Sequence, residues 1–148
     1  MQLLIDADGC PVVDLAITEA VCFQIPCTLV CDTAHQFDRP GVRTIVVSKG
    51  ADSADFMLVN LVHRGDLVVT QDYGLAAMCL ARGAFVINQD GMRYDDQNID
   101  ALLLARHTAK KIRMSGGRLK GPKKRTPEQN TQFRETLVRM LSEAGFSP

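Results

Sequence analysis

Five aspartates follow short apolar runs of the sequence, at positions where their carboxylates could act together. The apolar runs are 3–5, 44–47 and 67–70. The aspartates that come after them are Asp6, Asp8, Asp52, Asp55 and Asp72. If the runs are parallel strands, their carboxyl ends meet at one edge of a sheet, where open sheets bind ligands. We therefore expect these carboxylates to converge on one site.

A group of converging carboxylates favours a bound cation. Two carboxylates 4 Å apart repel each other by about 4 kcal/mol at an effective dielectric constant near 20. Oxygen-only ligands suit Mg²⁺ or Mn²⁺. Such an ion, with a substrate phosphate as a further ligand, activates water for attack on a phosphodiester. The spacing therefore predicts a divalent cation site with hydrolytic chemistry.

Simpler roles for the same aspartates remain open. Asp52 and Asp72 could each cap a helix, and Asp55 could be an acid of a first helical turn. Asp6 and Asp8 could belong only to a strand-to-helix turn. The hydroxyl of Thr70, two residues before Asp72, could orient a carboxylate or a metal-bound water, or could belong to an ordinary strand residue.

The net charge of zero hides a strong division along the chain. Residues 1–100 carry 14 acidic and 6 basic residues, whereas residues 101–148 carry 3 acidic and 11 basic residues. This division predicts an anionic partner for the C-terminal part, or a fold in which that part neutralises the acidic body. The candidate phosphate-binding residues are Lys49, Arg118, Lys120, Lys123, Lys124 and Arg125. The basic segment 113–125 contains no aromatic residue, which argues against recognition of nucleotide bases by stacking.

The elements that would position these residues alternate along one domain of 148 residues. Continuous apolar runs at 3–5, 27–31, 44–47, 67–70 and 84–87 predict an α/β fold with a parallel sheet of about five strands, flanked by helices. Apolar residues at helical spacing follow most of these runs. We expect Phe56 to lie on the apolar face of one such helix and Glu19 to be exposed to solvent. Residues 1–98 form an acidic body, and residues 99–148 a basic helical extension packed on it. Thr126 and Gln129 predict the start of the final helix.

The composition predicts a cytoplasmic protein that does not enter a membrane. No apolar run approaches the ~20 residues of a spanning helix. The opening residues 1–10 lack a basic region and include acids, so we expect no signal peptide.

Four segments together resemble the YaiI/YqxD family of small bacterial proteins. They are DADGCPV at 6–12, KGADSAD at 49–55, GDLVVTQD at 65–72 and GPKKRT at 121–126. The family resembles a branch of the PIN-like nuclease superfamily. That resemblance implies a three-layer fold with a carboxylate cluster that binds Mg²⁺ or Mn²⁺. By this resemblance, Asp6 matches the superfamily's acid after the first strand, and Asp52 or Asp55 matches the acid that opens the middle helix. Thr70 and Asp72 match its Thr-x-Asp segment after the fourth strand.

Three functions are compatible with the sequence. The leading hypothesis is a metal-dependent nuclease or other phosphodiesterase acting on RNA. Its metal ligands would be Asp6, Asp52, Asp55 and Asp72, with Asp8 beside them. The alternatives are a non-catalytic RNA-binding module, and a phosphatase resembling the haloacid dehalogenases, with Asp6 as nucleophile and Asp8 as general acid. The oligomeric state remains open.

Overall fold

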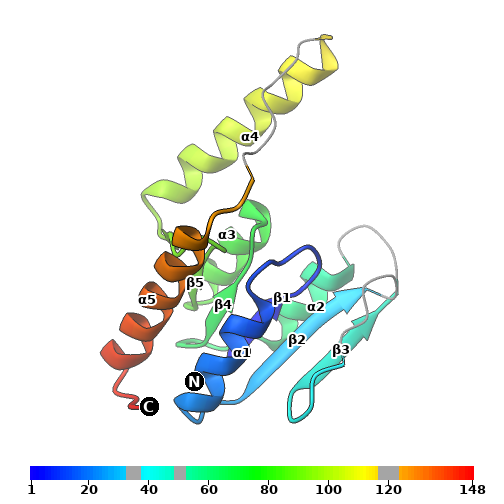
Figure 1. Cartoon of the computed structure of the whole chain (residues 1–148). Helices are drawn as coiled ribbons and strands as arrows, with labels where there is room; N and C mark the ends of the chain where they lie inside the picture. The colour runs from blue at the N-terminus through cyan, green and yellow to red at the C-terminus, as the bar shows by residue number, and fades with distance from the viewer. Residues whose placement is uncertain (33–37, 49–52, 117–123) are drawn as a thin grey trace.

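The computed structural model describes residues 1–32, 38–48, 53–116 and 124–148, which form an α/β fold of three layers (Figure 1). The strands within the described residues are β1 (Leu3–Asp6), β2 (Cys27–Asp32), β3 (Arg43–Val47), β4 (Leu67–Val69), β5 (Phe85–Ile87) and β6 (Arg93–Tyr94). The helices are α1 (Val13–Cys22), α2 (Ser53–Leu61), α3 (Tyr73–Ala81), α4 (Asn98–Met114) and α5 (Pro127–Glu143). The predicted α/β class is confirmed.

The sheet is mostly parallel and has the strand order β3-β2-β1-β4-β5-β6. The first five of these strands run parallel, and β6 pairs antiparallel with β5. The five predicted strands are confirmed. The sequence analysis missed β6, because a two-residue strand has no periodicity to recognise. It lies at the end of the sheet and follows a turn in which the Asn88 side chain accepts bonds from the backbone of Asp90 and Met92.

Both faces of the sheet are covered by helices, so the strands are apolar on both sides. On one face, Leu3 and Ile5 of β1 pack in a core with α1 and α5. On the other face, Leu4 packs in a second core with α2, α3 and the start of α4. All three side chains have 0% exposure. Figure 1 shows the three layers, with α1 and α5 in front of the sheet.

Two expectations about helix faces were wrong. Phe56 of α2 is 62% exposed, because the helix buries the face that carries Leu58 and Val62 instead. Glu19 of α1 is buried, with 5% exposure. Its Oε1 accepts a bond of 2.7 Å from Nε of Arg134, since α5 covers the side of α1 that would otherwise face solvent.

The C-terminal helices differ in how they meet the body. As predicted, α5 begins after Thr126, whose backbone N–H donates to the Gln129 side chain at 2.7 Å. This helix buries Phe133 and Leu137 against the first core. In contrast, α4 packs against α3 through its first turns and then extends away from the body (Figure 1). None of the helices in the described part of the chain is long and apolar enough to cross a membrane.

Candidate functional site

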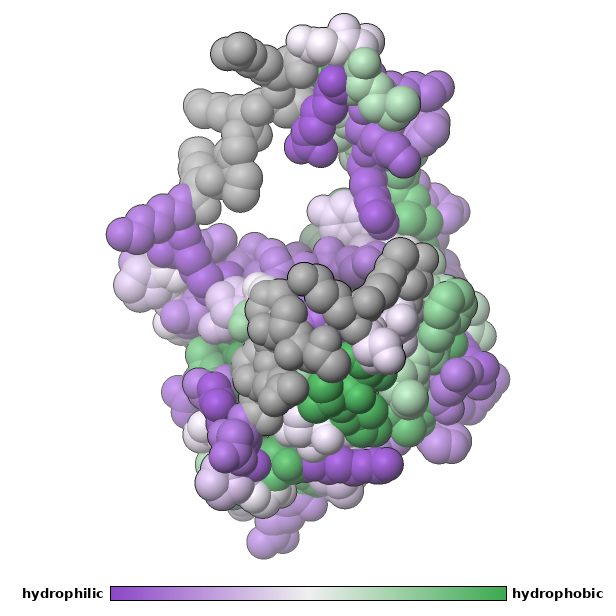
Figure 2. Space-filling model, turned by 90° about the vertical axis from the view of Figure 1, so that its right-hand side faces the viewer, coloured by the Kyte–Doolittle hydropathy of each residue, from purple (hydrophilic) through white to green (hydrophobic). Residues whose placement is uncertain are grey.

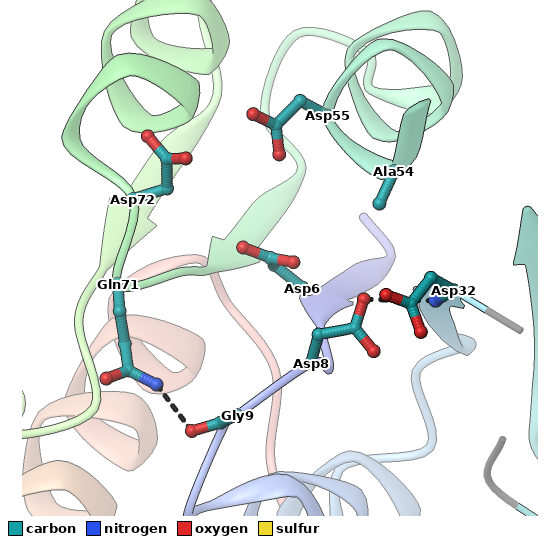
Figure 3. Close-up of a pocket in the computed structure, with 8 residues that line it drawn as sticks. All are labelled: Asp6, Asp8, Gly9, Asp32, Ala54, Asp55, Gln71 and Asp72. Atoms are coloured by element: carbon teal, nitrogen blue, oxygen red, sulfur yellow. Dashed lines mark hydrogen bonds between the residues drawn. The ribbon is translucent and has the colours of Figure 1, made fainter. Parts of the chain in front are cut away.

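The candidate site lies where the order of the strands reverses. From β1 the chain proceeds to β2 on one side, whereas β4 lies against β1 on the other side. A reversal of this kind opens a crevice at the carboxyl ends of the two central strands, which is where doubly wound sheets bind their ligands. A cavity of about 500 Å³ occupies this place (Figure 3). Its lining residues are Asp6, Asp8, Gly9, Asp32, Ala54, Asp55, Gln71 and Asp72.

The Thr70 hydroxyl connects the two central acids of the cavity. It donates a bond of 2.8 Å to Oδ2 of Asp6 and accepts a bond of 3.0 Å from the backbone N–H of Asp72. Thr70 itself is fully buried, and its carbonyl accepts a bond from the hydroxyl of Tyr94. The end of β4 is therefore fixed in position, and it fixes the Asp6 carboxylate at the end of β1.

Asp72 combines a structural role with a place in the cavity wall. Its Oδ1 accepts bonds from the backbone N–H groups of Gly74 at 2.8 Å and Leu75 at 3.2 Å, which caps the start of α3. The same oxygen lies 3.5 Å from Nη1 of Arg106, which reaches it from α4. The simpler capping role of Asp72 is thus real, and it places the carboxylate on the cavity.

Two cavity residues with polar side chains were not recognised in the sequence. Asp32 ends β2, and its backbone N–H donates a bond of 3.0 Å to Oδ2 of Asp8. It follows an apolar run, so the rule that selected the other aspartates would have selected it too. Gln71 donates a bond of 2.8 Å from its side chain to the carbonyl of Gly9 and so links the segments that follow β4 and β1 (Figure 3). No sequence pattern predicts that link.

The carboxylates around the cavity affect the protonation of Asp6. Burial raises the pKa of Asp6 from 3.8 to about 6. The bond from Thr70 works against this rise, while the nearby charges of Asp72 and Asp8 add to it. The carboxylate form of Asp6 is therefore less favoured than that of an unperturbed aspartate, and a cation in the cavity would stabilise it.

The donor set of the cavity fits a hard divalent cation, but the described residues do not form a preassembled cage. Carboxylate oxygens are the ligands that Mg²⁺ and Mn²⁺ prefer. Figure 3 shows the Asp6, Asp55 and Asp72 side chains directed toward a common space. Among the described residues, however, no three His, Cys, Asp or Glu side chains are close enough to hold an ion together. This arrangement suits Mg²⁺, which commonly binds one or two carboxylates and completes its shell with water and phosphate oxygens.

The predicted phosphate-binding residues are only partly placed. Four of them lie outside the described residues: Lys49, Arg118, Lys120 and Lys123. The predicted metal ligand Asp52 also lies outside the described residues. Lys124 is exposed.

Arg125 lies in a well-defined position away from the cavity lining. Its guanidinium donates to the Asp90 carboxylate and the Gln89 carbonyl, each at 2.6 Å, and to the Asn130 side chain at 2.8 Å. Its contacts therefore tie the turn after β5 to the start of α5, and they anchor the chain that enters this helix.

Comparison with known proteins identifies the family of the chain. The sequence model described as "Uncharacterized BCR, YaiI/YqxD family" matches residues 4–143. The chain belongs to the YaiI/YqxD family. The expected family resemblance is confirmed, and the matched range includes every described residue of the cavity.

Curated relatives in this family cover nearly the whole chain. A UPF0178 protein of Exiguobacterium sibiricum is 51% identical over 97% of this chain and 98% of its own length. A UPF0178 protein of Clostridium acetobutylicum is 46% identical over 95% of this chain and 97% of its own. A third UPF0178 protein, from Ruminiclostridium cellulolyticum, is 45% identical over 100% of this chain and 97% of its own length. No solved structure gave a significant match.

Proposed function

We propose that this YaiI/YqxD protein is a Mg²⁺- or Mn²⁺-dependent phosphodiesterase with a PIN-like site that cleaves RNA. The observation that carries the proposal is the set of aspartates around one open cavity at the strand reversal, where the pKa of Asp6 is raised by burial and by neighbouring acids. Several half-buried carboxylates around one cavity repel one another and do not by themselves stabilise the fold. They are useful when a cation and a phosphate occupy the cavity together.

Each described residue has a defined task in this proposal. One or two of Asp6, Asp55 and Asp72 would bind the cation directly, and the others would hold its water ligands. Asp52, the other predicted ligand, lies outside the described residues. Thr70 keeps the Asp6 carboxylate oriented toward the cavity, and Asp8 adds negative charge beside it. The cation, when bound, would polarise the phosphate and lower the pKa of the attacking water.

The decisive experiment is cleavage of end-labelled single-stranded RNA in Mn²⁺ by the wild type and by Asp72→Asn. Asparagine caps helices about as well as aspartate, so the variant should fold. We expect cleavage by the wild type and a loss of at least 100-fold in the variant, the order of effect of losing a principal electrostatic group. Asp96→Asn, which changes an exposed carboxylate outside the cavity, is the matched control and should cleave normally.

A second candidate function, a non-catalytic RNA-binding module, is favoured by the basic residues of α4. Equal cleavage by the wild type and Asp72→Asn would identify a contaminating nuclease and remove Asp72 from the site. Absence of cleavage by either, together with RNA binding in EDTA that survives Asp72→Asn, would favour the binding module over the nuclease.

A further inference from the structure

The outer half of α4 carries a positive face that begins at the cavity. Arg106 lies 3.5 Å from Asp72, a cavity residue, and its guanidinium also lies 3.7 Å from the position that a Cβ at Gly74 would take. It therefore sits over the start of α3. Arg106 thus forms an ion pair with an acid of the cavity.

Helical periodicity places two more cations on the same side. An α-helix turns about 100° per residue, so residues at i, i+4 and i+7 lie within an arc of about 60°. Arg106, Lys110 and Arg113 have this spacing, and all three are exposed. They cover about 10 Å along the axis of the helix.

The same face of α4 is apolar where the helix touches the body. Ile99 is buried against α3, and Leu102 is partly buried in the same core. By the same periodicity, these residues lie in line with Arg106. The face therefore changes from apolar to basic at the point where the helix leaves the body. In Figure 2 the outer half of α4 stands clear of the body and carries hydrophilic residues interspersed with hydrophobic ones.

No partner within the helix neutralises this positive face. Residues 101–114 contain no acid. Arg106 and Lys110, as an i, i+4 pair of like charge, destabilise the helix slightly. The favourable effect of cations at a helix C-terminus explains Arg113 but not Arg106, which lies in the middle of α4. A bound anion would relieve the repulsion along the whole face.

We propose that Arg106, Lys110 and Arg113 form a phosphate-binding face that holds the backbone of a polynucleotide as it leaves the cavity. The proposal rests on the proposed function and names its substrate class: a nucleic-acid strand that extends several nucleotides past the cleaved bond. Such a strand would otherwise be repelled by residues 1–100, which carry 14 acidic and 6 basic residues. The basic face offsets this repulsion and sets the direction of the strand.

The test is binding of a fluorescein-labelled oligouridylate in EDTA, measured by fluorescence anisotropy at several salt concentrations. Each phosphate contact on a single strand contributes about −0.7 to the slope of log K against log salt. We expect the double variant Lys110→Gln/Arg113→Gln to reduce the magnitude of the slope by about 1.4 and to weaken binding about 25-fold at ~0.1 M salt. Lys111→Gln is the matched control, because Lys111 lies about 100° around the helix from Lys110, the nearest residue of this face.

The outcomes separate this proposal from the proposed function. An unchanged slope in the double variant would overturn the phosphate-binding face, and so would an equal loss in Lys111→Gln, which would indicate a general effect of charge. Hydrolysis of bis(p-nitrophenyl) phosphate by the wild type in Mn²⁺ tests the cavity alone. Its absence, with the expected change in slope, would refute the phosphodiesterase and leave the binding face standing.

Discussion

Replacing Asp6 by asparagine should stabilise the metal-free protein, and the gain should depend on pH. The pKa of Asp6 is about 6 in the folded chain and 3.8 when unperturbed. The unfolded chain therefore loses this proton at a lower pH, and ionisation favours unfolding as the pH rises from 3.8 to 6. The difference of about 2 pKa units corresponds to about 3 kcal/mol above pH 6. Asparagine removes this penalty, and its carbonyl can still accept the bond from Thr70.

The assay is urea unfolding in EDTA at several pH values, followed by circular dichroism. We expect Asp6→Asn to raise the free energy of unfolding by up to about 3 kcal/mol at pH 8, by about half of that at pH 5, and by almost nothing below pH 4. Asp96→Asn, the control at an exposed carboxylate, should differ from the wild type by less than about 0.5 kcal/mol throughout. A gain that is absent at pH 8, or equal at all pH values, would refute the assignment of buried and uncompensated charge to Asp6.

The same variant tests the cation site. Mn²⁺ at 100 times its dissociation constant should stabilise the wild type by about 2.7 kcal/mol, because it binds only the folded protein. Asp6→Asn should lose most of this increase, and Asp96→Asn should keep it. Equal stabilisation of all three proteins would place the cation elsewhere.

Two further perturbations follow from contacts of the structure. Thr70→Val removes the hydrogen-bond donor to Asp6 and the acceptor for the Asp72 N–H. It should reduce the free energy of unfolding by about 1–3 kcal/mol at pH 8, and by less at pH 4, because Asp6 is protonated there. Urea unfolding at both pH values measures the two differences. Arg134→Met leaves the buried Glu19 carboxylate without its ion-pair partner and should lower the free energy of unfolding by about 1–3 kcal/mol in the same assay. Arg39→Met breaks an exposed ion pair and should lower it by less than about 1 kcal/mol.

The strands and the candidate acids could be predicted because their signals are local. The segment 67–69 is apolar at every position, and this is the pattern of a strand buried on both faces. Asp6 and Asp72 each follow such a run, and the geometry of a parallel sheet brings the carboxyl ends of neighbouring strands to one edge. The start of α5 was predictable for the same reason, since Thr126 and Gln129 form a cap within four residues.

Contacts between distant segments could not be predicted, because nothing near a residue in sequence records what packs on it. Glu19 has the chemistry of a solvent-exposed residue, and it is buried only because α5 lies across α1 and brings Arg134 to it. Phe56 has the chemistry of a core residue, yet it faces outward because Leu58 and Val62 already fill the face of α2 that meets the sheet.

The sequence by itself therefore determined the α/β class, the family and the aspartates at the strand ends. Only the tertiary structure decided how these groups meet. The strand order puts β1 beside β4, so that Thr70 reaches Asp6 and a shared cavity forms. The packing of α4 on α3 brings Arg106 to Asp72, although 34 positions separate them in the chain. The physical reason is that burial and charge are properties of a location in space, and several segments of the chain create each location together.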